Sequence, residues 1–130
     1  MRILLDTHCW LWLLAEPNRF APAVLTDLRN PAHDLLLSSA SSWEMTIKFD
    51  LGKLQLPFAP RDFIPSRMQA SGVAPLAITH EHALAVGKLP NVHRDPFDRM
   101  LIAQAKVEDL VILTADRVFS NYDVGLLRPN

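Results

Sequence analysis

Four acidic residues with the chemistry of a cation site are spread along the whole sequence. Asp6 and Asp116 each follow a short apolar run, whereas Glu44 and Asp98 lie near the start of helix-like segments. Carboxylates gathered in one place repel one another and cannot all ionise without a compensating charge. Hard divalent cations such as Mg²⁺ and Mn²⁺ provide that charge, because they prefer oxygen ligands. If the fold brings the four acids together, they predict a site where one or two ions activate water for phosphodiester cleavage.

The elements that must position these acids are indicated by hydrophobic periodicity and by the placement of Pro and Gly. Short apolar runs that stop at polar residues predict strands, and apolar residues recurring every three or four positions predict helices. The predicted strands are 2–5, 35–38, 73–78, 110–113 and 124–127. The predicted helices are 8–15, 22–28, 41–51, 61–70, 79–86 and 96–107, the last of which begins at Asp95 or Pro96.

Strands that alternate with helices along the whole chain predict an α/β fold with a mainly parallel sheet and helices on both faces. Pro75 suggests that the strand 73–78 lies at an edge of the sheet or breaks early. In open α/β sheets, ligands bind beyond the carboxyl ends of the strands. The four acids fall near those ends, so we expect them to converge there. The length of 130 residues predicts a single domain over 1–130.

Composition limits the class of protein without identifying an activity. The 13 basic and 14 acidic residues give a net charge of −1, which argues against a broadly basic nucleic-acid sleeve. A hydrophobic content of 49% excludes a disordered chain. Cys9 is the only cysteine, so an intramolecular disulfide and a multi-cysteine zinc site are excluded, and we interpret it as a buried thiol. No targeting or membrane segment is recognised, and the expected location is the cytoplasm.

Each acid also has a purely structural explanation. Glu44 fits a capping box with Ser41 and an i, i+4 ion pair with Lys48. Asp95 fits the N-cap position of the helix that follows it, and for this residue we favour that explanation. The remaining explanations are helix capping for Asp6, interaction with the helix dipole for Asp98 and a turn for Asp116. The functional interpretation depends on the joint position of the acids after strands.

Four blocks of sequence carry a resemblance to a known family. They are LLDTH (4–8), SASSWEMTIK (39–48), DPFDRMLIAQA (95–105) and LTADRVF (113–119). In this order they resemble the PIN-domain family and, within it, the VapC-like toxins of bacterial toxin–antitoxin pairs. The resemblance implies a three-layer α/β/α sandwich with a central, mainly parallel sheet of about five strands. It also implies a Mg²⁺- or Mn²⁺-dependent endoribonuclease that forms a homodimer and is held inactive by a small DNA-binding antitoxin.

The resemblance assigns roles to residues in the matching blocks. The implied catalytic and metal-binding residues are Asp6, Glu44, Asp98 and Asp116. Asp98 rather than Asp95 aligns with the family acid, because an apolar run and two alanines follow it at the family spacing. Position beside the acids suggests supporting roles for four further residues. These are Thr7, for a phosphate oxygen or a ligand carboxylate, Asp95, on the same helical face as Asp98, and Arg99 and Arg117, for the RNA backbone, although surface arginines are more often simply solvated.

Three other functions are compatible with parts of this pattern. A PIN-like binding module without catalysis would keep the fold, but the full set of acids argues against it. A nuclease acting on DNA is also possible, because metal ions and carboxylates do not distinguish the sugar. A phosphoacceptor signalling domain also gathers acids around Mg²⁺, but here Asp6 stands alone and Arg128 is the only basic residue after the last strand.

Histidine and tryptophan side chains allow further hypotheses. The five histidines together have no convincing metal-binding spacing; they are His8, His33, His80, His82 and His93. His80 and His82 would point to different sides of a helix, and we interpret them as surface or capping residues. The tryptophans offer base-stacking surfaces, although core packing or a subunit interface is the preferred interpretation; they are Trp10, Trp12 and Trp43.

Overall fold

One five-stranded sheet forms the centre of the computed structural model, which describes residues 1–130. The strands are β1 (Arg2–Leu5), β2 (Asp34–Ser38), β3 (Val73–Leu76), β4 (Val111–Leu113) and β5 (Gly125–Leu127). The helices are α1 (Thr7–Ala15), α2 (Pro22–Arg29), α3 (Ser39–Asp50), α4 (Pro60–Ser71), α5 (His80–Ala85) and α6 (Pro96–Glu108). Short 3₁₀ turns cover Pro17–Arg19, Val86–Lys88 and Arg117–Asn121. No helix is long and apolar enough to cross a membrane.

The sheet has the order β3-β2-β1-β4-β5, and every neighbouring pair of strands is parallel. The register places Leu4 of β1 between Leu36 of β2 and Ile112 of β4. β3 lies at one edge, as Pro75 predicts, since a residue without an N–H is tolerated there. The strand ends at Leu76, two residues earlier than expected.

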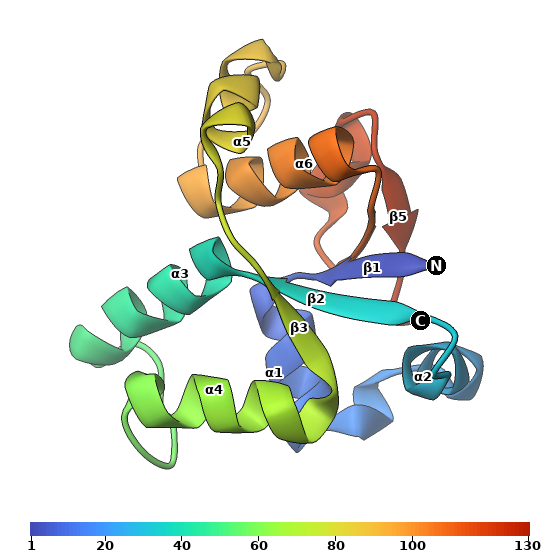
Figure 1. Cartoon of the computed structure of the whole chain (residues 1–130), viewed down its shortest axis with the longest axis vertical. Coiled ribbons are helices and arrows are strands. Elements are labelled where there is room, and N and C mark those ends of the chain that lie inside the picture. Colours follow the sequence, from blue (N-terminus) through green and yellow to red (C-terminus); the bar gives the residue numbers. More distant parts are fainter.

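Successive residues of each strand face opposite sides of the sheet, so the sheet supports two separate cores. Ile3 and Leu5 belong to a core with residues of α1–α4, whereas Leu4 belongs to a core with residues of α6. Figure 1 shows α5 and α6 on one side of the sheet and α1, α2 and α4 on the other. This arrangement confirms the predicted three-layer α/β/α fold.

The start of α3 differs from its predicted position by two residues, and the bounds of the other helices differ by at most one residue. α3 begins at Ser39, directly after β2, and its N-cap is Ser38, whose hydroxyl accepts from the Ala40 N–H. α4 continues through Pro65 and ends at Ser71, and its C-cap is Gly72, which has a positive φ of 69°. Pro65 lies in the second turn of α4, and the helix is kept despite it because Phe63 and Ile64 are buried in the core.

Candidate active site

The first acid is held between the ends of two neighbouring strands. Asp6 follows β1, and its backbone N–H donates to the carbonyl of Leu113 at the end of β4 (3.0 Å). Its Oδ1 accepts from the Cys9 N–H (2.7 Å), which caps α1. Asp6 is buried, yet this cap uses only one of its carboxylate oxygens. Capping and a role in the site are therefore compatible for this residue.

Glu44 on α3 is buried, and both of its oxygens have partners. Oε1 accepts from the Thr7 hydroxyl and Oε2 from Lys48 Nζ, both at 2.7 Å. The hydrogen bond to Glu44, together with the charges of Asp95 and Asp98, raises the pKa of Lys48 despite its partial burial. Lys48 therefore remains a cation beside the acids, and the predicted i, i+4 pair is confirmed.

The predicted capping box between Ser41 and Glu44 is wrong. α3 begins two residues earlier, so Ser41 lies inside the helix, where its buried hydroxyl has no hydrogen-bond partner. Glu44 instead accepts a hydrogen bond from the hydroxyl of Thr7, the first residue of α1. The physical reason is that the Ser38 hydroxyl already satisfies the start of the helix.

The third and fourth acids, Asp98 and Asp116, meet a histidine that the sequence pattern did not predict as a ligand. One ligand atom each from His93, Asp98 and Asp116 lies within 4.8 Å of the others. His93 Nε2 is 2.8 Å from Asp98 Oδ2. His93 lies in the loop three residues before α6, and no motif or periodicity in the sequence marks it as a partner of Asp98. We call this set the His93 cluster.

The electrostatics of Asp98 reflect an excess of negative charge. Burial, with further contributions from Asp95 and Glu44, raises the pKa of Asp98 to about 6, although the hydrogen bond from His93 acts in the opposite direction. A carboxyl group in this state is poised to exchange a proton for a cation near neutral pH. The donor set of two carboxylates and one imidazole fits a divalent ion, since such ions bind oxygen and nitrogen ligands of this kind.

The supporting residues adopt different roles. Asp95 is the N-cap of α6, as favoured above, and its Oδ1 accepts from the N–H groups of Phe97 and Asp98. Arg99 donates to the carbonyls of the loop before α6 and to the Tyr122 hydroxyl, so its guanidinium is occupied by the protein itself. Arg117 is exposed beside Asp116 and has no ion pair or side-chain hydrogen bond.

Two other residues noted in the sequence lie outside the site. His82 caps α5, as predicted, but it is fully buried rather than on the surface, with Nε2 3.0 Å from Glu108 Oε2. Cys9 is buried in the core, as predicted, and burial raises the pKa of its thiol well above the ordinary value. Neither group is available for catalysis at the carboxyl edge of the sheet.

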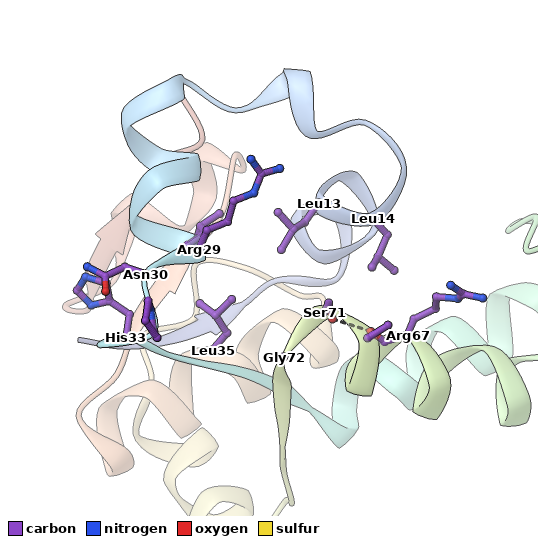
Figure 2. Close-up of a pocket in the computed structure, with 12 residues that line it drawn as sticks. Leu13, Leu14, Arg29, Asn30, His33, Leu35, Arg67, Ser71 and Gly72 are labelled. Atoms are coloured by element: carbon purple, nitrogen blue, oxygen red, sulfur yellow. Dashed lines mark hydrogen bonds between the residues drawn. The ribbon is translucent and has the colours of Figure 1, made fainter.

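A cavity of about 610 Å³ lies at the opposite, amino end of the strands. It is lined by the C-terminal ends of α1, α2 and α4 and by residues just before β2 and β3, including His33 and Gly72 (Figure 2). No acid lines it, and Arg29 and Arg67 supply its charged groups. The cation chemistry therefore does not belong to this cavity.

Comparison with known sequences places the chain in a family. The model of the PIN domain family matches residues 3–125. A curated relative, ribonuclease VapC16 from Mycobacterium tuberculosis, is 42% identical over 70 residues. That match covers 54% of this chain, and the chain spans about half the length (48%) of the relative.

Solved structures share the complete fold at low sequence identity. VapBC2 from Rickettsia felis bound to a promoter DNA fragment aligns with a TM-score of 0.73 and 14% identity over 100% of both chains. DNA-bound VapBC from Salmonella typhimurium gives 0.71 and 17%, covering 100% of this chain and 99% of that one. VapBC-1 from nontypeable Haemophilus influenzae gives 0.67 and 18%, covering 98% of each. With the family model spanning nearly all of the sequence, the chain belongs to the PIN domain family.

Proposed function

We propose that the protein is a Mg²⁺- or Mn²⁺-dependent endoribonuclease and the toxin of a type II toxin–antitoxin pair. The observation that carries the proposal is the His93 cluster, which gathers donors for a divalent cation at the carboxyl edge of the PIN sheet. A relative is named as a ribonuclease, and several structures with the same fold are toxin–antitoxin complexes. The proposed partners are RNA, a small DNA-binding antitoxin and a second copy of this chain. The proposed location is the cytoplasm.

The proposed mechanism divides the work between the acids and their neighbours. His93, Asp98 and Asp116 would hold a divalent ion, and Asp6 and Glu44 would add negative charge at the same edge of the sheet. Thr7 and Lys48 fix the Glu44 carboxylate from both sides. When bound, the ion would act as a Lewis acid, which activates water and stabilises the charge that develops on the phosphate.

The chain's own residues set the conditions for this reaction. Asp98 must lose its proton before it can act as a ligand, and its pKa of about 6 allows this at neutral pH. Lys48 lies beside Glu44, and the negative charges of Asp95 and Asp98 help to raise its pKa. It is therefore a fixed cation available to a phosphate oxygen. Arg117 is exposed beside Asp116 and is free to contact the RNA backbone.

Cleavage of single-stranded RNA by the purified protein tests the proposal. We expect cleavage with Mn²⁺ or Mg²⁺, no cleavage with EDTA, and a loss of at least about 100-fold in rate for Asp98→Asn. Asp50→Asn, which alters an exposed acid at the far end of α3, is the matched control and should cleave normally. An Asp6→Ala protein that cut RNA at the wild-type rate would remove Asp6 from the assignment. Equal cleavage with and without EDTA would overturn metal dependence.

A further inference from the structure

Two aromatic side chains meet between α3 and α6, the helices that carry Glu44 and Asp98. Trp43 of α3 and Phe97 of α6 pack edge to face, with ring centroids 5.2 Å apart and an interplanar angle of 83°. Despite this contact, Trp43 remains 60% exposed. A single exposed indole is ordinary on a protein surface, so its meaning depends on whether it belongs to a larger apolar surface.

The pair is tied to the active site by its position in the chain. Trp43 immediately precedes Glu44, and Phe97 immediately precedes Asp98, so each aromatic residue shares a helical turn with a proposed catalytic acid. Consecutive residues of a helix point to different faces, so a group that packs on this pair lies on a face of the two helices that adjoins the acids.

A cavity of about 340 Å³ opens beside the pair. Trp43 and Phe97 line it together with the apolar side chains of Ile78, Val86 and Met100. Arg94, which directly follows His93 in the sequence, also lines the cavity. Arg94 is exposed and has no ion pair or side-chain hydrogen bond, unlike the neighbouring Arg99.

These features match the chemistry of a nucleotide within single-stranded RNA. Unpaired bases bind proteins by stacking on aromatic rings, and every base has a face that can stack. An unpaired arginine at the same cavity complements the phosphate charge that accompanies each base. The combination of aromatic rings, an apolar lining and a free guanidinium beside the acids therefore favours RNA over an apolar protein segment.

We propose that Trp43, Phe97 and Arg94 form a subsite for a nucleobase next to the scissile phosphate. The base stacks against the indole of Trp43 and enters the apolar cavity, while Arg94 contacts an adjoining phosphate. This inference rests on the proposed ribonuclease function, and it assigns Trp43 the role of a positioning residue that determines where RNA is cut.

Fluorescence titration with RNA tests the subsite directly. The protein carries Asp98→Asn, so that RNA is bound without being cut, and the probe is a 12-nucleotide single-stranded RNA without metal. We expect quenching of the emission from Trp43 and loss of most of that quenching in Trp43→Phe, because the other two tryptophans are wholly or partly buried. The variants that lack this indole are compared by the fluorescence anisotropy of the same RNA carrying an end label. By that measurement Trp43→Ala should weaken binding about 5- to 150-fold, the range of single base–aromatic stacking contacts. Trp43→Phe should stay within about threefold of the parent.

Cleavage by the otherwise wild-type enzyme provides the second readout. We expect Trp43→Ala to raise KM with little change in kcat and to broaden the choice of cleavage sites. When a single abasic nucleotide is placed at each position of the RNA in turn, the wild-type enzyme should show the same rise in KM at one position only. Leu51→Ala removes another exposed apolar side chain, at the far end of α3, and is the matched control.

The possible results separate this inference from the proposed function. If the wild-type protein cuts RNA and Trp43→Ala binds and cuts it with unchanged affinity and site preference, the subsite is overturned and the ribonuclease stands. If Trp43→Ala converts a dimer to a monomer in sedimentation equilibrium without altering RNA affinity, this face is a contact between copies and the subsite is also overturned. If the wild-type protein neither binds nor cuts RNA, the proposed function itself fails.

Discussion

At the scale of single residues, the site shows how one carboxyl group can be prepared for a cation. Asp98 carries an elevated pKa because it is largely buried near the negative charges of Asp95 and Glu44. Its hydrogen bond with His93 only partly offsets this effect. Glu44, by contrast, has both oxygens bonded to Thr7 and Lys48. The negative charge of Glu44 is therefore already balanced by its partners, whereas Asp98 still lacks a balancing positive charge.

The elevated pKa of Asp98 predicts how the stability of the metal-free protein depends on pH. A carboxyl whose pKa is higher in the folded than in the unfolded chain contributes fully to stability below about pH 4, and this contribution is lost as the pH rises through 6. We expect the free energy of unfolding to fall by up to about 3 kcal/mol from this group. Urea denaturation at a series of pH values measures it, with EDTA present.

Asp98→Asn is the comparison for that series, since it removes the titration and keeps the shape. The difference in unfolding free energy between the variant and the wild type should grow from pH 4 to pH 7. A constant difference across this interval would show that Asp98 titrates at its ordinary pKa, unaffected by burial and by the neighbouring negative charges.

His93 predicts a preference among divalent ions. An imidazole ligand suits transition metals better than Mg²⁺, so the His93 cluster should bind Mn²⁺ more tightly than Mg²⁺. His93→Ala should weaken Mn²⁺ binding about tenfold or more and reduce that preference. Titration calorimetry measures both affinities, and His80→Ala, which changes an exposed histidine on α5, is the control. Identical Mn²⁺ affinity in the wild type and His93→Ala would exclude His93 as a ligand.

At the scale of elements, the strand ends and helix starts bring the site together. Ser38 begins α3 immediately after β2, and Asp95 begins α6, so two helices start at the edge where β1 and β4 end. These caps satisfy backbone N–H groups at the starts of α3 and α6. Because Asp95 bonds two backbone N–H groups, it orients the first turn of α6 that holds Asp98.

The capping role of Asp95 predicts a measurable loss of stability. Asp95→Ala should lower the free energy of unfolding by about 1 kcal/mol, whereas Asp95→Ser should restore most of it, because a serine hydroxyl also caps helices. Chemical denaturation of the three proteins at pH 7 checks this expectation. If Asp95→Ser were as unstable as Asp95→Ala, capping would not be the contribution of this residue.

Much of this element structure could be predicted from sequence, for a physical reason. Parallel strands are buried on both faces and appear as short apolar runs, so Leu4 and Ile112 identified their strands directly. The start of α3 could not be predicted, because both Ser38 and Ser41 are good caps and only the packing against Thr7 decides between them. His93 was missed because it reaches Asp98 from a loop, where sequence periodicity carries no information.

At the scale of the whole molecule, the net charge conceals an uneven distribution. Setting aside the four proposed acids changes the formal charge from −1 to +3. The chain therefore combines a concentrated negative edge with a mildly basic remainder, which suits a protein that holds cations and approaches RNA phosphates. A cation bound at that edge should stabilise the entire fold, since a ligand that binds only the folded state shifts the folding equilibrium.

The melting temperature in the presence and absence of Mn²⁺ tests the central claim, that the His93 cluster binds a divalent cation. With Mn²⁺ at about 100 times its Kd, the expected stabilisation is about 2.7 kcal/mol, which raises the melting temperature by several degrees. Each protein is compared with its own EDTA-treated sample, and the shift should be present in the wild type and in Asp50→Asn but absent in Asp98→Asn. Equal shifts in wild type and Asp98→Asn, or no shift in any of them, would contradict the account.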